Sequence, residues 1–579
     1  MYNKRFLLTI GVVAMVCMSA TAQGIAKNYK ETSNGNPISA SVFCADPTAL
    51  EYEGRLYVYG TNDHQEFIAN GKKGDNSYGN IKSLVVFSTA DMVNWTFHGT
   101  IDTKKICASW GNNPWYQGYG VSWAPSVTWR TTAAGTDEFF LYFCNSSHGV
   151  GVLKANSPIG PWKSPLKKLM IHYDSPGAFP MNSSANFDPG VVIDDNGVGW
   201  ISFGGLNDGG QLLPDNARIA KLKPSMTELD GEAVRIPAPY HFEANELNVI
   251  DGKYVYTYCS HWTRNNTEWN TYKNKHGINA SIPEGGTMCY MVSDNPTDPD
   301  SWVYKGAYGP GVGGNNHSHL QKFKDHYYHI YHNHGSVLLD AMKKAGAVDG
   351  SAGDYRSICV NEVTVNESTQ KISQAKLTIE GVKAICNLNP YELQQAETMA
   401  TCGGVSYEDF ANLGTSEGLG NDASKNLKVK MAKGAWTMVR SVGFGDLGAA
   451  SFTFRAKGSG TMEIRLGRYN KAAATVSFSS STFKDHVVEL DPATFQGVKS
   501  VYFIFTDAEN VQFDSWQFFE AEPDGVSVLS APSPVSTLQS YDVMGRRVPS
   551  STQKTPIVIE RYVDQEGVQR VRKYVTPVR

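Results

Sequence analysis

The sequence lacks the charge pattern of a nucleic-acid-binding protein. Its 52 Lys and Arg residues are matched by 56 Asp and Glu residues, which leaves a net charge of −4. The charges are spread along the chain, and there is no basic stripe of the kind that binds a polyanion. We therefore expect no nucleic-acid partner.

Metal-binding cysteine patterns and long hydrophobic runs are also missing. No two of the nine cysteines form a CxxC pair or another spacing typical of zinc ligands. Outside the N-terminus, no apolar run is long enough to span a bilayer. These absences argue against a zinc module and against a membrane span.

Long amphipathic helical patterns are a third absence, which leaves an all-β fold as the expectation. Glycine occurs 55 times, and aromatic residues make up 11% of the chain. At 579 residues the chain is too long for one hydrophobic core, so we expect two or three domains.

The N-terminal residues 1–22 have the pattern of a signal peptide. A basic pair precedes the apolar run 6–18, and small residues at 20–22 supply a cleavage site. We expect cleavage before Gln23 and export of the protein. Lipidation at Cys17 is the alternative, although the residues before it form a poor lipidation site.

Eight cysteines remain after the predicted cleavage. Four of them lie inside apolar strand patterns, where a cysteine is usually a small buried hydrophobe: Cys144, Cys259, Cys289 and Cys359. An oxidising compartment permits one or two disulfides, but the spacing does not decide which residues pair.

Five segments share one pattern, a polar or glycine turn followed by alternating aromatic and aliphatic residues. They are residues 52–59, 137–143, 194–203, 251–258 and 324–331. Asp-Gly, Asn-Gly or Glu-Gly ahead of such alternation is a strong hairpin signal. Because the copies recur at roughly 55 to 85 residues, each fits one four-stranded unit. The repeat therefore predicts a five-bladed β-propeller over residues 36–385.

The rest of the chain predicts two further β domains. Short alternating strands without the turn-aromatic pattern fill residues 391–520 and indicate a β-sandwich, or jelly roll. A linker rich in Ser and Pro follows, and residues 535–579 contain enough alternating sequence for a small β module.

Three acidic residues lie in apolar or aromatic surroundings close to the predicted hairpins. Asp46 and Asp188 each precede a proline, and Glu243 lies just before the fourth hairpin. Proline fixes an extended backbone at the residue before it. An Asp-Pro pair often does no more than start a turn. Three such acids before different repeats instead favour one converging site at the propeller axis.

Carboxylates held together in apolar surroundings raise one another's pKa. Glycoside hydrolysis needs one protonated acid to donate to the leaving oxygen and one ionised base to activate water. Three converging acids supply both roles and a third group to tune the donor.

The motifs in residues 36–385 resemble glycoside hydrolase family 43, with its arabinoxylan arabinofuranohydrolases as the most similar group. The motifs that carry the resemblance are Asn36-Pro-Ile, Ala45-Asp-Pro, Ser122-Trp-Ala-Pro, Phe187-Asp-Pro, Phe242-Glu-Ala, Gly313-Gly-Asn-Asn-His317 and Tyr355-Arg-Ser. Their order and context agree with the family. The resemblance implies a five-bladed propeller and an inverting mechanism.

By matching position, the resemblance assigns roles to the acids. Asp46 is expected as the general base and Glu243 as the general acid, with Asp188 raising the pKa of the donor and orienting it. Glu246 is the rival for Glu243. It lies three residues further on, with its side chain on the opposite face of an extended strand, so we prefer Glu243.

Three other residues match family positions near the active site. His317 is expected near the axis, where it binds a central ion, often through water. Arg356 is expected to hold a sugar hydroxyl or the acids, with a surface salt bridge as the alternative. Trp123 is a candidate sugar-stacking wall, with core packing as the alternative. Strand alternation places the neighbouring histidines on both faces, so most are expected at the solvated surface: His319, His326, His329, His332 and His334.

The second domain resembles a family 6 carbohydrate-binding module. Glu397 and Asp514 match ligands of the structural calcium that this family often holds. Trp436 matches a position of its fold pattern. The loop that begins at Gly420 lacks the aromatic residue expected as a sugar platform, and Tyr407 is the available substitute. Sugar binding and simple packing against the propeller are the two alternatives for this domain.

The tail contains Tyr541-Asp-Val-Met-Gly-Arg-Arg-Val548, which resembles the C-terminal sorting modules of secreted Bacteroidetes proteins. An ordinary hairpin turn is the alternative. We expect an exported protein of a Gram-negative bacterium that is periplasmic, secreted or bound to the cell surface.

The leading functional hypothesis is a monomeric α-L-arabinofuranosidase that acts on plant arabinoxylan with inversion and without an organic cofactor. A β-xylosidase acting on xylo-oligosaccharides is the second, because the family contains both activities. A non-catalytic glycan-binding propeller is a third, although clustered like charges give a binding site no advantage.

Overall fold

The computed structural model describes residues 24–111, 118–206, 208–333, 337–407, 426–522, 536–541, 557–563 and 569–575. The chain divides into two compact units, Met1–Phe519 and Glu520–Arg579. The predicted signal peptide, with Cys17, lies outside the described residues.

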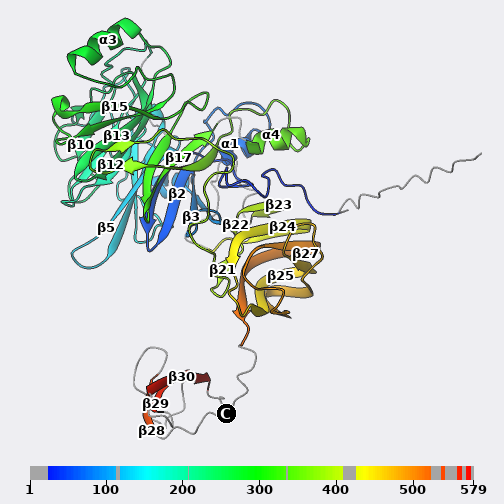
Figure 1. Cartoon of the computed structure of the whole chain (residues 1–579). Coiled ribbons are helices and arrows are strands. Elements are labelled where there is room, and N and C mark those ends of the chain that lie inside the picture. Colours follow the sequence, from blue (N-terminus) through cyan, green and yellow to red (C-terminus); the bar gives the residue numbers. More distant parts are fainter. Residues whose placement is uncertain are drawn as a thin grey trace, which may run out of the picture. The chain divides into compact units, whose positions relative to one another are not determined.

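The first unit begins with five antiparallel sheets that follow one another in chain order (Figure 1). The first contains β1 (Ala45–Tyr52), β2 (Arg55–Thr61), β3 (Leu84–Thr89) and β4 (Trp95–Ile101). The second contains β5 (Trp123–Thr131), β6 (Asp137–Cys144) and β7 (Val150–Ala155). The third contains β8 (Gly190–Ile193), β9 (Gly199–Phe203), β10 (Arg218–Lys221) and β11 (Val234–Arg235). The fourth contains β12 (His241–Ile250), β13 (Lys253–Ser260), β14 (Met288–Ser293) and β15 (Val303–Gly309); the fifth contains β16 (Ser318–Phe323), β17 (His326–Asn333) and β18 (Ser357–Val363). A short pair, β19 (Val365–Asn366) and β20 (Lys371–Ile372), follows.

All five predicted hairpins are confirmed. Each repeated segment contributes the second strand of an antiparallel pair: β2, β6, β9, β13 and β17. At the tip of the first hairpin, Glu53 and Gly54 have φ of 48° and 72°. Two consecutive left-handed residues match the twist of the flanking strands, which explains the polar-glycine turns of the repeat.

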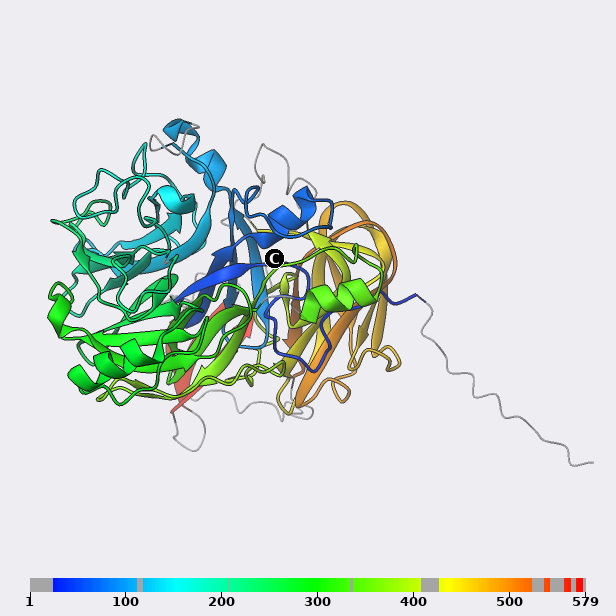
Figure 2. The same cartoon turned by 90° about the horizontal axis from the view of Figure 1, so that it is seen from above.

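The first strands of the five sheets contact one another in a closed cycle, from β1 through β5, β8, β12 and β16 back to β1. In Figure 2 the blue, cyan and green sheets follow one another around a common centre. Residues at the start of these five strands therefore face a shared interior.

A backbone kink recurs where four of these strands begin. Asp46, Ala124, Asp188 and Ala244 have φ of 47°, 30°, 48° and 64°. The pairing register shifts beside three of these residues, between Ala45 and Thr48 in β1, between Trp123 and Ser126 in β5, and between Glu243 and Glu246 in β12. A bulge of this kind bends the strand and re-aims a side chain. Asp46 and Asp188 thus occupy equivalent positions in different sheets.

Helices are short and lie outside the sheets. They are α1 (Asp63–Ala69), α2 (Thr103–Ile106), α3 (Asn266–Lys275), α4 (Val337–Lys344) and the single 3-10 turns η1 (Ala108–Trp110), η3 (Ser146–His148) and η4 (Pro299–Ser301). The Asn62 side chain caps α1 by accepting the Gln65 N–H at 3.2 Å. In the described part of the chain, no helix has the length and apolar character needed to cross a membrane.

The first unit continues into a β-sandwich region. It contains β21 (Gln394–Gln395), β22 (Thr398–Met399), β23 (Thr401–Tyr407), β24 (Val429–Gly443), β25 (Ala449–Arg465), β26 (Ala474–Glu489) and β27 (Val498–Glu520). Five of these strands pair in the order β23, β24, β27, β25, β26. Phe452, Phe503 and Trp516 pack together in its core, and Trp436 is also fully buried.

The sandwich is joined to the first sheet by backbone pairing. β22 pairs with β4, so that Thr398 lies opposite Thr96. The Asn94 Nδ2 donates to the Arg440 carbonyl at 2.8 Å, and its Oδ1 accepts the Arg440 N–H at the same distance. The two regions therefore form one compact unit, and the boundary near residues 385–391 stays a prediction.

The second unit contains β28 (Ser536–Tyr541), β29 (Ile557–Val563) and β30 (Gln569–Val575), which form an antiparallel sheet. These strands lie within the predicted module of residues 535–579. Most of the motif that resembles a sorting signal, together with the loop at Gly420, lies outside the described residues.

All eight cysteines after the predicted signal peptide are free thiols, and Cys386 is the exposed one. The predicted burial of Cys144, Cys259, Cys289 and Cys359 is confirmed.

Candidate active site

The structure brings Asp46, Asp188 and Glu243 together. The His317 Nδ1 lies 3.9 Å from the Asp46 Oδ1 and 3.9 Å from the Asp188 Oδ2. The same Asp188 oxygen accepts the backbone N–H of Ala244 at 3.0 Å, directly after Glu243 in the chain. Three acids that are nearly 200 residues apart in sequence thus converge at the centre of the ring of strands.

The Asp46 carboxylate is held in its ionised form. Burial by itself raises its pKa, but the Arg356 guanidinium and His332 oppose this effect and hold the pKa well below its usual range. The Arg356 Nη1 donates to the Asp46 Oδ1 at 2.8 Å. Asp46 is therefore ionised at any pH near neutrality.

His332 orients Asp46 through its backbone. The Asp46 N–H donates to the His332 Nδ1 at 3.0 Å, and the His332 Nε2 lies 3.1 Å from the Asn315 carbonyl oxygen. The same Nδ1 lies 3.3 Å from the Asp46 Oδ1, so the ring contacts both the backbone and the carboxylate of Asp46. This chain of hydrogen bonds keeps the kinked start of β1 in place.

Asp188 and Glu243 are shifted in the opposite direction from Asp46. Burial and the charge of Asp46 raise the pKa of Asp188, although the Ala244 N–H partly offsets this effect. Burial and the charges of Asp188 and Asp46 raise the pKa of Glu243 well above its usual range. Glu243 is only half-buried, so its proton remains accessible from the open side of the site. The different surroundings of Asp46 and Glu243 thus favour an ionised carboxylate at one residue and a protonated carboxyl at the other.

Arg356 is buried, which excludes the alternative of a surface salt bridge. Its Nε and Nη2 donate to the two oxygens of Asp63, each at 2.9 Å, while Nη1 donates to Asp46. Such a two-point contact fixes the plane of the guanidinium. Asp63 is the first residue of α1 and is fully buried. No local pattern indicates this role, because an acid in the first helical turn is common.

Glu246 lies deeper than Glu243. Its Oε2 accepts the Ser126 hydroxyl at 3.2 Å, and its Oε1 lies 3.2 Å from the His319 Nδ1. The side chain is completely buried. Since both oxygens are directed at interior partners, the geometry favours Glu243 for contact with a substrate.

Aromatic side chains lie beside Arg356 and beside Glu243 in the chain. The half-buried Trp123 donates its Nε1–H to the Tyr78 carbonyl at 3.0 Å, and the Tyr78 ring centre lies 5.0 Å from the Arg356 guanidinium. Next to Glu243, the rings of Phe242 and Trp262 meet edge to face at 5.0 Å. Trp262 is 41% exposed and was not predicted as a site residue.

The prediction that most of the neighbouring histidines are solvated is wrong. His319, His329 and His332 are buried, and His326 alone of the described ones is exposed, while His334 lies outside the described residues. The reason is that the residues from Tyr328 to His332 in β17 are all buried, so both faces of this strand are covered, and His319 is buried on the neighbouring β16. Burial lowers the pKa of His329 to about 3.

The His317 position fits an ion that takes one protein nitrogen. Its Nε2 is buried without a hydrogen-bond partner in the described structure, and burial lowers the pKa of the ring to about 4. Within the described ranges, no three His, Cys, Asp or Glu side chains cluster as a metal site. Any central ion would need water for its other ligands.

Glu397 and Asp514 differ in their surroundings. Both carboxylate oxygens of Glu397 are buried without a hydrogen-bond partner among the described residues, and burial raises its pKa well above the usual range. The Asp514 Oδ1 instead accepts from the Lys428 Nζ and the Asn426 Nδ2, each at 2.7 Å. Glu397 therefore fits a cation ligand, whereas Asp514 is already neutralised by an ammonium group.

Comparison with known proteins gives consistent matches. The family model described as "Glycosyl hydrolases family 43" matches residues 34–336. The chain is 34% identical to an arabinoxylan arabinofuranohydrolase of Bacillus subtilis (strain 168), over 88% of this chain and 98% of that protein. It is 32% identical to an arabinoxylan arabinofuranohydrolase of Paenibacillus polymyxa, over 89% of this chain and 78% of the other.

A solved structure has a similar fold. It is a glycoside hydrolase family 43 arabinoxylan arabinofuranohydrolase from Bacillus subtilis in complex with cellotetraose. The TM-score is 0.71 at 33% identity, and the match covers 86% of this chain and all of that one.

Proposed function

Because the chain belongs to glycosyl hydrolases family 43, we propose that it removes arabinofuranosyl side chains from arabinoxylan. Two relatives that match most of its length carry this activity in their names. The observation that supports the chemistry is the opposite shift of the Asp46 and Glu243 pKa values in one converging cluster.

The proposed mechanism is a single displacement with inversion. Asp46 takes a proton from water as the water oxygen attacks the anomeric carbon of arabinose. Glu243 gives its proton to the departing oxygen of the xylan chain as the glycosidic bond breaks. Asp188 keeps that proton on Glu243 by adding negative charge beside it and anchors the strand through the Ala244 N–H. An inverting enzyme holds its two carboxyls roughly 6.5–9.5 Å apart, which leaves space for the water.

The architecture that we propose for residues 36–385 is a five-bladed β-propeller. The closed cycle of contacts among five first strands supports it. For residues 391–520 we propose a module of carbohydrate-binding family 6, which the long strands β24 to β27 support. For the N-terminal residues we propose a signal peptide and export.

The proposed metal is calcium. His317 would hold a central ion with one nitrogen, and the ion would add positive charge near the acids. In the sandwich, Glu397 would supply carboxylate oxygens, which calcium prefers. Lys428 occupies the partner position on Asp514, so the second site depends on Glu397.

The substrate is expected to lie between the two aromatic walls. Trp123 and Tyr78 stand on the Arg356 side, while Phe242 and Trp262 stand on the Glu243 side. Sugar rings present C–H faces that pack on such side chains. This arrangement leaves the polar acids at the base of the site.

The test is hydrolysis of arabinoxylan, followed by NMR of the first product. An inverting α-L-arabinofuranosidase releases β-L-arabinofuranose before mutarotation, and the Asp46→Asn variant releases none. Preferential cleavage of an aryl β-D-xyloside over an aryl α-L-arabinofuranoside would replace the proposal with a β-xylosidase. Retained polysaccharide binding without cleavage of either glycoside would identify a glycan-binding protein.

A further inference from the structure

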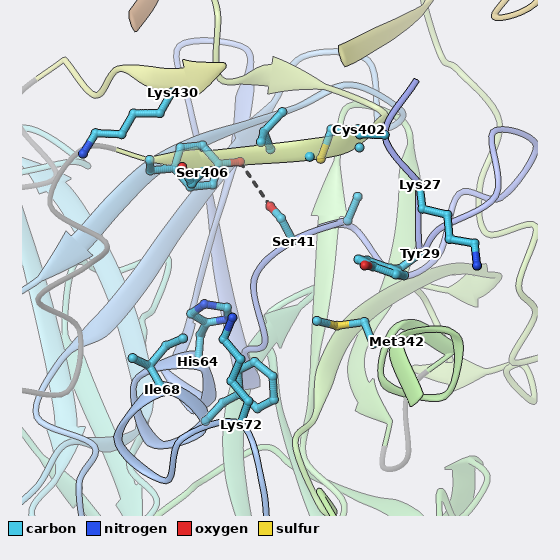
Figure 3. A pocket seen from close by; sticks show the side chains of 17 residues that line it. Lys27, Tyr29, Ser41, His64, Ile68, Lys72, Met342, Cys402, Ser406 and Lys430 are labelled. Carbon is cyan, nitrogen blue, oxygen red and sulfur yellow. Dashed lines mark hydrogen bonds between the residues drawn. The ribbon is translucent and has the colours of Figure 1, made fainter. Parts of the chain in front are cut away.

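A cavity of about 460 Å³ lies within the first compact unit, apart from the candidate active site (Figure 3). Side chains of α1, α4, β23 and the N-terminal segment line it, among them His64, Met342 and Cys402. None of the three converging acids lines it. Helix α1 borders both places, because its Asp63 binds Arg356 and its next residue, His64, lines the cavity.

The cavity carries an excess of positive charge. Lys27, Lys72 and Lys430 lie around its rim (Figure 3), with Lys27 and Lys72 exposed and Lys430 half-buried, and no Asp or Glu is among its described lining residues. His64 adds no charge, because burial and the nearby Lys72 ammonium lower its pKa to about 3. A ligand that gains from these three ammonium groups is an anion.

The rest of the lining suits a sugar ring. Tyr29 and Phe67 provide aromatic surface. The Ser41 and Tyr407 hydroxyls, which also line the cavity, are hydrogen-bonded to each other at 3.2 Å. Gly403 and Gly404 of β23 also line it, and the side where each lacks a Cβ is occupied by Ala26. Saccharides combine C–H faces with many hydroxyls, and a cavity of this size lies within the range of small-ligand sites.

We propose that this cavity is a second carbohydrate site, which takes a sugar bearing a carboxylate, that is, a uronic acid unit. The clustered carboxylates of the catalytic centre repel such a group, whereas the three lysines attract it. The choice of a xylan chain as carrier of the uronic acid rests on the proposed function. Through this site, the enzyme would hold an acidic branch of the polymer whose neutral arabinose branches it removes.

Binding of a matched pair of ligands tests the proposal. The probes are xylotetraose bearing one 4-O-methylglucuronic acid and plain xylotetraose, titrated calorimetrically into the full chain. The acidic ligand should bind at least tenfold more tightly, and the difference should shrink as NaCl rises from 50 to 300 mM. Equal affinity for both ligands, or for the acidic ligand after its carboxyl is reduced to an alcohol, would overturn the proposal.

The triple variant Lys27→Gln, Lys72→Gln, Lys430→Gln should lose the preference for the acidic ligand. The matched control removes the same charge at exposed lysines outside the cavity, as Lys433→Gln, Lys471→Gln, Lys484→Gln, and should keep it. Thermal unfolding of both variants checks that they are folded. Equal affinity of the two variants for the acidic ligand would refute the site.

Three competitors identify the chemical class of the anion. Free glucuronate or inorganic phosphate should compete at least tenfold more weakly than the acidic tetrasaccharide. A poly-glutamate peptide that competes as well as the saccharide would overturn the saccharide assignment. Neither binding experiment requires turnover, so both can be interpreted even if the proposed hydrolase activity is absent. Hydrolysis of an aryl α-L-arabinofuranoside should be the same in both triple variants.

Discussion

Glu243 has the half-buried, protonated carboxyl that a leaving-group donor needs. Replacing it with alanine should abolish release of arabinose from polysaccharide, where the departing alcohol needs a proton. The same variant should keep part of its activity on an aryl arabinofuranoside with a very good leaving group, which departs unprotonated. Steady-state rates on the two substrates check this, with Asp46→Asn inactive on both. Equal loss on both substrates in Glu243→Ala would remove the residue from the donor role.

The negative charge of Asp188 is one cause of the raised pKa of Glu243. In Asp188→Asn that charge is absent, so the pKa of Glu243 should fall. Since activity requires the protonated donor, the alkaline limb of kcat/KM should move to lower pH, by about one unit. The acid limb should move little, because Arg356 still holds Asp46 ionised. A pH–rate profile decides, and an alkaline limb that stays in place would contradict the assignment of Asp188.

Asp63 is a positioning residue that acts on Asp46 through Arg356. In Asp63→Asn the guanidinium loses its charged two-point contact, and Arg356 no longer holds the Asp46 carboxylate as firmly. We expect kcat to fall at least tenfold with little change in KM, because the Asp46 carboxylate is no longer held firmly in place. The exposed Asp349→Asn serves as control. A kcat within twofold of that of the unsubstituted protein would exclude Asp63 from positioning Asp46.

The predictable part of the site is the part that carries a local sequence signal. Asp46, Asp188 and Glu243 could be selected because each lies in an apolar motif before a hairpin, and the structure brings them together. Asp63 could not, because its role depends on Arg356, which lies 293 residues away. His332 was misjudged because alternation along a strand does not reveal whether both faces are covered.

At the scale of elements, the connection after β13 supplies an exposed aromatic wall. Trp262 is packed against Gly285 and Gly286, where an added Cβ would lie 2.9 Å from its Cα and 3.0 Å from its Nε1. No periodic pattern marks this residue, so the sequence did not point to it. The two glycines allow the indole to lie flat against the chain beside Phe242.

Trp262→Ala should weaken binding of the polymer without affecting the chemistry. We expect KM for arabinoxylan to rise severalfold to tenfold, since loss of one stacking ring costs about 1 kcal/mol. The kcat on a small aryl arabinofuranoside should stay within twofold. Tyr469→Ala, at an exposed aromatic residue of the sandwich, is the matched control. An unchanged KM for the polymer would exclude Trp262 from the substrate path.

The hairpins were predictable because their turns and alternation are local, whereas the pairing of β22 with β4 was not. That pair joins residues 302 positions apart and is only two residues long. In the sequence, the hairpin pattern ends near residue 390, which predicts a domain boundary there. The pairing of β22 with β4 nevertheless joins residues from the two sides of that boundary. Long-range pairing of this kind depends on packing that no short pattern records.

At the scale of the whole molecule, the sandwich should unfold together with the five sheets. Asn94 is buried and exchanges two hydrogen bonds with the Arg440 backbone. Asn94→Ala leaves buried polar groups unsatisfied, at a cost of about 1–3 kcal/mol. We expect the melting temperature to fall by a few degrees in scanning calorimetry, with Asn270→Ala on the exposed face of α3 unchanged. A separate early transition for the sandwich would contradict this coupling.

The left-handed kink at the start of four strands has a consequence for how such a catalyst can change. The same backbone kink occurs at Asp46, Ala124, Asp188 and Ala244, and only two of these four residues are acids. The side chains of Ala124 and Ala244 are instead buried among hydrophobic neighbours, so an acid at either position would have to displace packed groups. An acid is therefore more easily exchanged at Asp46 or Asp188 than added at the other two kinks.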